Sequence, residues 1–313
     1  MQIKYGLNSD KLADLKTKLD TILLKSVITV NRDKHPESRQ VMMNTYNAAF
    51  KNWPTPDTSF FVNGRFGKTY VIQWGNPEND TLVLLHGLAG NVTLWGKEII
   101  EQLSKQFFII AIETMGDNVG RSIPTQWPME RNTLRVWLDE LLDTLKLSSV
   151  NLVGHSSGGW LAMDYAIHYQ QHVKSLSAIG AAGLCKPKIG FMLKMMYLTL
   201  RNTKKVCKRH IRFSILPVLI LNRLISNISF NLYQHCKQST LYPRRFTSEE
   251  LGRIKVPVLI VIGIDEHFFD VKKAEYRGNK HILLSQVHMV ENAGHLAHID
   301  RPEAVSSLVI GFH

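Results

Sequence analysis

Cysteine is scarce in this chain, and its spacing does not suggest a disulfide framework or a metal site. The 313 residues include three cysteines, Cys185, Cys207 and Cys236, with no C-x-x-C pair. This odd number argues against structural disulfides and zinc and fits a reducing compartment. The first ten residues lack the apolar segment of a secretory signal. We therefore expect a cytoplasmic protein that needs neither a metal ion nor another cofactor.

Long hydrophobic runs are also missing from the sequence. The longest strongly apolar run, residues 213–221, has nine residues and contains Pro217. A membrane-spanning helix needs about 20 apolar residues, so this run is too short. A chain that is 44% apolar and 20% charged, without an internal repeat, has the composition of a globular protein. Intrinsic disorder, collagen and coiled coils are excluded on the same grounds.

Acidic residues are absent from residues 165–248, which carry 14 lysines and arginines. The net charge of +12 therefore comes from this segment. The simplest interpretation is a solvated basic helical surface. Attraction of anionic substrates, or weak association of residues 185–245 with an anionic membrane surface, are the alternatives. No nucleic-acid-binding motif accompanies the charge, so we do not expect nucleic acid as a partner. The oligomeric state stays open.

Strand and helix patterns alternate along most of the chain. Residues 1–40 are predicted to form a helical appendage, because leucines recur there at helical spacing. From about residue 58 the pattern becomes β, and a helix is expected over 92–106. Continuous apolar runs, which suit strands buried on both faces, occur at 81–85, 107–112, 150–153 and 256–262. This alternation predicts an α/β fold with a doubly wound, mostly parallel sheet over residues 41–184 and 246–313.

The interruption at residues 185–245 is basic and rich in methionine. An insertion that leaves the sheet after one strand and returns to the next is most simply a helical lid. Such a lid would cover the carboxyl edge of the strands, where open α/β sheets bind their ligands.

The sharpest motif is Gly154-His155-Ser156-Ser157-Gly158, which follows a predicted strand and opens a predicted helix. A G-x-S-x-G turn at such a junction holds its serine on a strained bend with the hydroxyl exposed above the sheet. The glycines are needed because a Cβ would clash where strand and helix cross. We predict that Ser156 is a nucleophile; the alternative is a glycine-rich turn that only connects the two elements.

A serine hydroxyl is a poor nucleophile without a base. His295, in Asn292-Ala293-Gly294-His295, follows the last predicted strand and should therefore lie beside Ser156. We predict that His295 is this base. His155 is expected to pack under the Ser156 turn, and His298 is expected to have a structural or surface role.

The imidazole of such a base also needs a carboxylate on its far nitrogen. No acid occurs between Asp164 and Glu249, so the loop after residues 258–262 is the place that remains, and its candidates are Asp265, Glu266 and Asp270. An oxyanion site requires two backbone N–H groups. We predict those of Ser157 and Leu88.

Together these motifs resemble the α/β-hydrolase superfamily, through His86-Gly87-Leu88, the Ser156 turn and the His295 loop. More narrowly, the chain is similar to bacterial carboxylesterase-like serine hydrolases, which share Arg65–Thr69, Gly116-Asp117 and Phe246-Thr247. The resemblance implies a triad of Ser156, His295 and a carboxylate, a helical lid, and hydrolysis of a small-molecule carboxylic ester or thioester. The usual aspartate position is occupied by Glu266, which we prefer as the acid, with Asp265 as the alternative.

Two other functions stay open at this point. The chain could be a low-turnover ligand sensor or interaction protein that retains the triad, or an acyltransferase that uses an alcohol in place of water. A haloalkane dehalogenase or an epoxide hydrolase is disfavoured, because those enzymes need a carboxylate where Ser156 stands.

Overall fold

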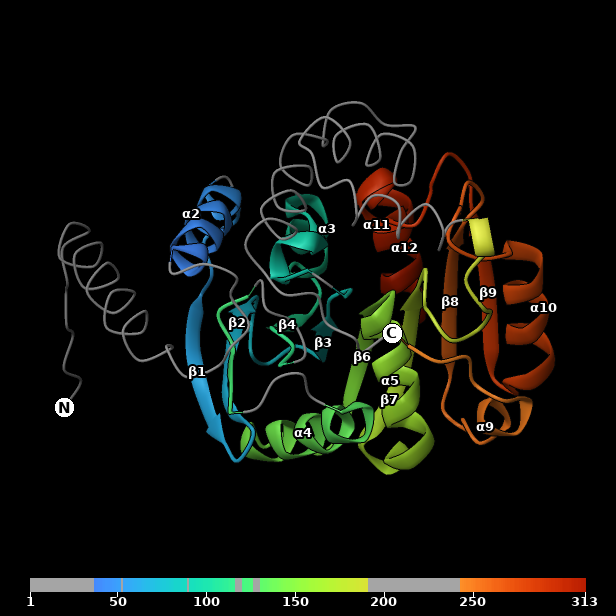
Figure 1. The fold of residues 1–313 in the computed structure, drawn as a ribbon, viewed down its shortest axis with the longest axis horizontal. Coiled ribbons are helices and arrows are strands. Elements are labelled where there is room, and N and C mark those ends of the chain that lie inside the picture. Colours follow the sequence, from blue (N-terminus) through green and yellow to red (C-terminus); the bar gives the residue numbers. More distant parts are fainter. Residues whose placement is uncertain (1–36, 52, 89, 116–119, 126–129, 191–242) are drawn as a thin grey trace, which may run out of the picture.

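The computed structural model describes residues 37–51, 53–88, 90–115, 120–125, 130–190 and 243–313 (Figure 1). The amphipathic pattern of the first 36 residues and most of the expected lid, residues 191–242, lie outside the described residues.

One twisted sheet forms the centre of the described fold. Its strands follow the order β1-β2-β4-β3-β6-β7-β8-β9, and β5 pairs with β2. β1 and β2 are antiparallel, whereas β3, β4, β6, β7, β8 and β9 run parallel to one another. This confirms the predicted doubly wound, mostly parallel α/β sheet. The strands are β1 (Thr58–Gly64), β2 (Gly67–Trp74), β3 (Thr81–Leu85), β4 (Phe108–Ile112), β5 (Ile123–Pro124), β6 (Val150–His155), β7 (Val173–Ile179), β8 (Val258–Gly263) and β9 (Ser285–Val290).

Helices connect the strands and cover both faces of the sheet. They are α2 (Ser38–Phe50), α3 (Lys97–Leu103), α4 (Arg131–Thr144), α5 (Ser157–His168), α9 (Ser248–Gly252), α10 (Val271–His281), α11 (Ala297–Asp300) and α12 (Pro302–Phe312), with 3-10 turns η1 (Val92–Trp95) and η2 (Gln170–His172). Within the described residues, none of these helices combines the length and apolar character that crossing a lipid bilayer requires.

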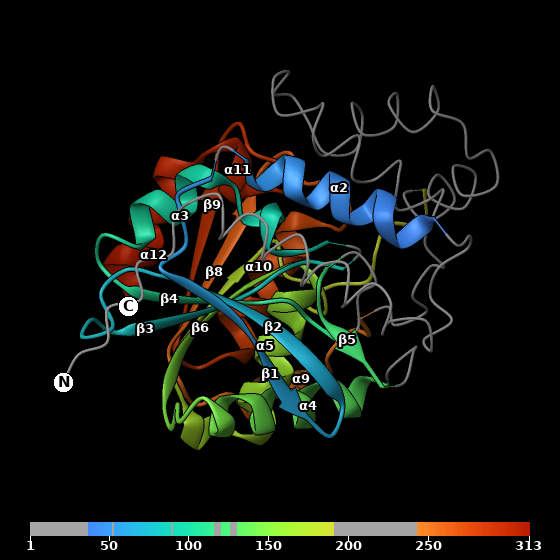
Figure 2. The same cartoon turned by 90° about the vertical axis from the view of Figure 1, so that its left-hand side faces the viewer.

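The two faces of the sheet carry separate cores, as β3 illustrates. Val83 and Leu85 pack with residues of α4, α5, α9 and α10, whereas Leu82 and Leu84 pack with residues of α3 and α12. All four side chains are fully buried. Successive side chains on a strand point to opposite faces, so a strand between two helical layers must be apolar at every position. Figure 2 shows the layers on opposite sides of the sheet.

The helix expected over 92–106 is divided in the structure. Gly96 adopts φ 78°, which lies outside the helical region, and it separates η1 from α3. The side chain of Asn91 caps η1 by accepting a hydrogen bond from the Thr93 N–H at 2.9 Å. The apolar spacing fits either arrangement, so the prediction of one continuous helix was wrong at this glycine.

Helix α2 was not expected, and it crosses residue 40, the predicted end of the N-terminal appendage. Its Tyr46 is buried, and the ring of Phe50 stacks on Tyr46 with 5.2 Å between centroids. Phe50 also lies 6.4 Å from the ring of Trp74 in β2. These contacts attach α2 to β2, the second strand of the sheet.

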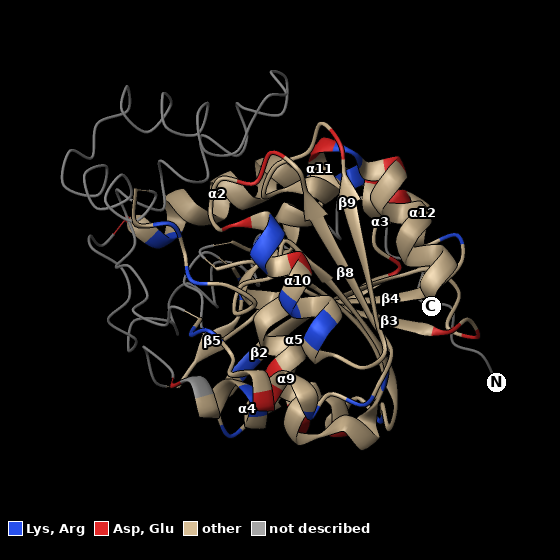
Figure 3. Cartoon of the chain, turned by 90° about the vertical axis from the view of Figure 1, so that its right-hand side faces the viewer, with Lys and Arg blue, Asp and Glu red and all other residues tan. Residues whose placement is uncertain are grey.

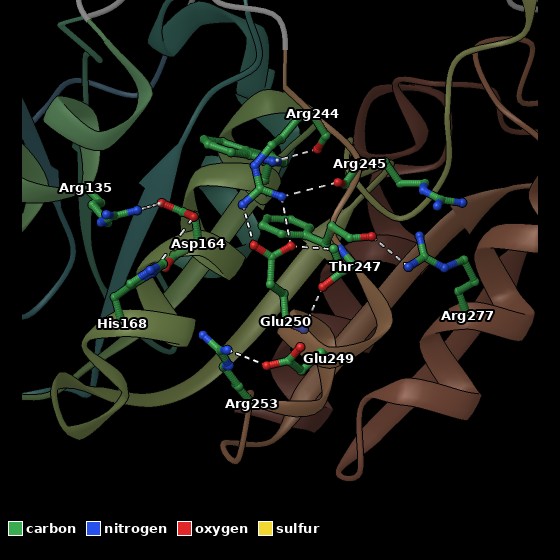
Figure 4. A network of polar contacts seen from close by, with 12 residues as sticks. Arg135, Asp164, His168, Arg244, Arg245, Thr247, Glu249, Glu250, Arg253 and Arg277 are labelled. Atoms are coloured by element: carbon green, nitrogen blue, oxygen red, sulfur yellow. Dashed lines mark hydrogen bonds and ion pairs between the residues drawn. The ribbon is translucent and has the colours of Figure 1, made fainter.

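The chain leaves the described fold after β7 and returns before α9 at nearly the same point. The Phe246 N–H donates to the carbonyl of Gly183 at 2.9 Å. Arg277 of α10 is buried and donates to the carbonyls of Leu184 and Phe246, the latter at 2.7 Å (Figure 4). A single guanidinium, with its rigid set of donors, thus holds both ends of the interruption.

Candidate active site

Ser156 occupies a strained turn between β6 and α5. Its backbone has φ 52° and ψ −112°, one of three positive φ values at non-glycine residues in the described part of the chain. Three backbone hydrogen bonds hold this conformation: the Ser156 N–H donates to Ile179, and the Ser156 carbonyl accepts from Trp160 and Ala182. A strained conformation persists only where the surrounding structure enforces it, and such residues cluster at functional sites.

The glycines of this turn are needed because backbones meet closely there. A Cβ on Gly158 would lie 2.0 Å from the carbonyl oxygen of Leu85, at the end of β3. A Cβ on Gly154 would lie 2.5 Å from the backbone of Gly158. Any larger residue would force α5 away from the sheet and displace the Ser156 hydroxyl.

His295 reaches Ser156 from the loop after β9. Its Nε2 lies 2.9 Å from the Ser156 Oγ, although the two residues are far apart in the chain. The loop approaches β7 closely, since a Cβ on Gly180 would lie 2.9 Å from the His295 carbonyl oxygen. The Gly294 N–H donates to the Asp300 carboxylate at 2.8 Å, which ties this loop to α11.

Among the three candidate acids, Glu266 is the one that meets His295. Its Oε2 lies 2.6 Å from the His295 Nδ1, and its side chain is 1% exposed. Asp265 is exposed, and Asp270 caps α10 by accepting from the Lys273 N–H at 3.1 Å. The structure therefore brings Ser156, His295 and Glu266 into one row and leaves Asp265 outside it.

The charges of His295 and Glu266 support each other. Burial alone would lower the pKa of His295, but the adjacent Glu266 carboxylate outweighs burial and raises that pKa above its ordinary value. Burial alone would raise the pKa of Glu266, but the His295 imidazole, together with the Phe268 N–H and His267, outweighs burial and lowers that pKa. The arrangement therefore favours a carboxylate beside an imidazole that can take up a proton.

The two predicted oxyanion residues flank Ser156. Ser157 is the first residue of α5, where a backbone N–H has no partner within the helix. On the other side, a Cβ on Gly87 would lie 3.4 Å from the Ser156 Cβ, so the backbone just before Leu88 runs close to the nucleophile.

His86 holds this second loop in place. Its Nε2 accepts from the Thr114 N–H at 3.1 Å, so its Nδ1 carries the proton and donates to the Gly87 carbonyl at 2.9 Å. Burial lowers the pKa of His86 to about 4, which keeps the ring neutral and this pattern intact.

His298 is buried, so of the structural and surface roles left open by the sequence the surface role was wrong. Its Nε2 hydrogen-bonds the Leu94 carbonyl at 2.8 Å, and its ring lies 5.1 Å from that of Trp95 and 4.6 Å from that of His155. Burial lowers the pKa of His298 to about 4. His155 is buried as well and hydrogen-bonds the His295 carbonyl through Nε2 at 3.0 Å.

We expect acid to destabilise the fold through His298. The pKa of His298 is about 4 in the folded chain and 6.5 ordinarily. The stability that accompanies its neutral ring is therefore fully present above pH 6.5 and is lost as pH falls from 6.5 to about 4. Between pH 7 and pH 4.5 this loss should be about 2 kcal/mol of unfolding free energy. Urea unfolding at both pH values should show that His298→Gln loses less stability than the wild type by this amount. An equal loss in both proteins would contradict the prediction.

Two contributors to the site carried no recognisable signal in the sequence. Phe268 donates its N–H to the Glu266 Oε1 at 2.6 Å, and its ring stacks on that of His295. Asp300 supports the His295 loop. Both act through contacts that exist only in the folded chain.

Within the described ranges, no group of three histidine, cysteine or acidic residues is arranged to hold a metal ion.

Comparisons with known proteins agree with the fold. A family model described as alpha/beta hydrolase fold matches residues 80–204. An uncharacterized carboxylesterase, nap, of Bacillus subtilis is 27% identical over 86% of this chain and 90% of its own length. The carboxylesterase YbfK of the same organism is 27% identical over 88% of this chain and 94% of its own length.

Solved structures give the same result. The crystal structure of the B. subtilis naproxen esterase (carboxylesterase NP) has a TM-score of 0.80 and 25% identity, and the match covers 89% of this chain and 99% of that one. The structure of B. subtilis carboxylesterase CesB (YbfK) has a TM-score of 0.79 at 27% identity, over 88% of this chain and 98% of that one. The resemblance inferred from the sequence is thereby confirmed: the chain has the α/β-hydrolase fold and is similar to bacterial carboxylesterases over most of its length.

Proposed function

We propose that this chain hydrolyses small-molecule carboxylic esters through an acyl-enzyme on Ser156, with His295 as the base and Glu266 as its carboxylate partner. One observation carries the proposal: the Ser156 Oγ, the His295 imidazole and the Glu266 carboxylate form a continuous row with contacts of 2.9 Å and 2.6 Å. Serine hydrolases need this order of nucleophile, base and orienting acid.

Acylation starts when the Ser156 Oγ attacks the ester carbonyl and His295 Nε2 takes the hydroxyl proton. A C–O bond forms to Ser156, and the carbonyl oxygen becomes negatively charged. When the bond to the leaving group breaks, the protonated His295 gives its proton to the departing alkoxide. The Glu266 carboxylate holds the opposite nitrogen and stabilises the imidazolium between these two steps.

Deacylation repeats the sequence with water as the nucleophile. His295 takes a proton from water, the hydroxide attacks the acyl carbonyl, and the Ser156 Oγ leaves with the proton returned by His295. A thioester would follow the same two steps with a thiol as the first product. Transfer to an alcohol in place of water stays the alternative.

The backbone N–H groups of Leu88 and Ser157 are proposed to bind the developing oxyanion. The close approach of Gly87 to Ser156 and the position of Ser157 at the start of α5 support this assignment. Losing one such donor typically costs about 3–4 kcal/mol of transition-state stabilisation. Recruitment of anionic substrates or membranes by residues 185–245 stays a prediction, because most of that segment lies outside the described residues.

A fluorophosphonate probe tests the proposal directly. It should add one phosphonyl group per chain, peptide mapping should place that group on Ser156, and pre-incubation with a short-chain ester should slow the labelling. Ser156→Ala should remain unlabelled. Labelling of Ser156→Ala at the wild-type rate, or a labelled wild type without ester turnover, would overturn the proposal; the second result would favour the ligand-sensor alternative.

A further inference from the structure

The imidazole of His295 lies among three aromatic rings. The ring of Phe268 is nearly parallel to it, with 5.0 Å between centroids and 15° between planes. Phe269 and His155 present their rings at steep angles, with centroids 6.5 Å and 5.1 Å from His295. Phe268 is therefore the ring that offers its π face to the imidazole.

The backbone of Phe268 is held on both sides. Its N–H donates to the Glu266 Oε1 at 2.6 Å, while the other oxygen of that carboxylate faces His295. Its carbonyl accepts from the Lys188 N–H at 2.8 Å, and Pro187 forms a β-bridge with Phe269. The ring thus stands on a short, doubly anchored piece of chain, and its place over His295 does not depend on side-chain contacts alone.

We propose that Phe268 is a positioning residue for ester hydrolysis, whose ring holds the His295 imidazole toward Ser156 and favours its protonated form. This inference rests on the proposed function, in which His295 becomes an imidazolium between proton uptake and release. The negative face of an aromatic ring attracts a cation by about 0.5–2 kcal/mol, depending on how far the site excludes water. The interaction is stronger with the imidazolium than with the neutral ring, so it acts in the transition state.

Other groups around His295 also influence its protonation. The carboxylates of Glu266 and Asp300 favour the imidazolium, against the effect of burial. The pKa values of His155 and His298 are lowered by burial and further by the charge of His295, so both rings stay neutral beside it. A substitution of the Phe268 side chain leaves these four residues in place. It also keeps the Phe268 backbone N–H that holds Glu266. A change in the pH profile can therefore be assigned to the ring.

The test compares Phe268→Leu, which keeps an apolar side chain without a π face, with Phe268→Trp, which keeps the π face. For a p-nitrophenyl ester, Phe268→Leu should lower kcat about 3- to 30-fold. The acidic limb of its kcat/KM profile should move to lower pH by about 0.4 to 1.5 units. Phe268→Trp should keep the limb at the wild-type pH. Phe61→Leu, on β1 beside Tyr70, removes an aromatic contact outside the site and serves as the control.

A second pair of variants tests the backbone anchor. Lys188→Pro removes the N–H that holds the Phe268 carbonyl, whereas Lys188→Ala keeps it. Lys188→Pro should lower kcat and shift the limb as Phe268→Leu does, and Lys188→Ala should resemble the wild type. If the acidic limb of the kcat/KM profile does not move in Phe268→Leu, the proposed role of Phe268 is overturned, even where kcat or KM changes. A wild type that is neither labelled at Ser156 nor active on esters would instead overturn the proposed function itself.

Discussion

Ser156→Ala is expected to lower kcat/KM for a p-nitrophenyl ester by about 10⁵- to 10⁶-fold. Alanine has no oxygen to form the acyl-enzyme, so the remaining rate would come from water activated beside His295 and from the oxyanion site. The burst of nitrophenol that precedes the steady state should disappear with the acyl-enzyme. Stopped-flow absorbance measures the burst, and initial rates measure the loss.

A buried serine elsewhere in the chain supplies the matched control. Ser306 of α12 is fully buried, and its Oγ has no hydrogen-bond partner among the residues that the structure describes. Ser306→Ala removes a hydroxyl as Ser156→Ala does. Because Ser306 lies outside the candidate active site, its substitution should affect stability more than rate and leave kcat/KM within about twofold of the wild type. Activity of Ser156→Ala within tenfold of the wild type would mean that another group is the nucleophile.

Glu266→Gln is expected to lower kcat by about 10⁴-fold, the loss typical when the carboxylate partner of a catalytic histidine becomes an amide. The pH profile should change as well. His295 must be neutral to accept the Ser156 proton, and the Glu266 carboxylate holds the pKa of His295 above its ordinary value. Without this carboxylate, His295 loses its proton at lower pH, so the acidic limb of kcat/KM moves to lower pH.

Asp265→Asn is the control for this second prediction, because it removes the neighbouring carboxylate that the sequence could not exclude. Asp265 is exposed and lies outside the row of Ser156, His295 and Glu266. Its substitution should change kcat less than about threefold, as expected for a surface charge that is screened by solvent. If Asp265→Asn caused the larger loss, the assignment of the acid would have to be reversed.

The parts of the site that follow from local sequence were predictable. The turn around Ser156 and the loop of His295 each follow a strand directly, and parallel strands bring their carboxyl ends to one edge. The choice between Glu266 and Asp265 was not predictable to the same degree. A shift of one residue turns a side chain from the interior to the solvent, and the backbone hydrogen bonds that set this direction involve distant residues such as Ala293.

The fold shows the same division between local and long-range information. Apolar runs identified the central strands because burial on both faces leaves a continuous signal. Helix α2 was missed because its burial depends on aromatic contacts with Trp74 and its neighbours, and the division at Gly96 depends on one backbone angle. Phe268 escaped notice for a related reason: its importance lies in a ring stacked on a residue far along the chain.

The meeting of the chain at Leu184 and Phe246, held by Arg277, makes the intervening segment a replaceable module. Since both ends are already together, the entropy cost of closing a longer or shorter connection grows only with the logarithm of its length. Neither the sheet nor the row from Ser156 to Glu266 has to change when the part of that connection beyond Lys188 does, because Pro187 and Lys188 already hold the chain beside Phe268 and Phe269. A contiguous stretch of the chain can thus be exchanged while the groups proposed to carry the reaction stay in place.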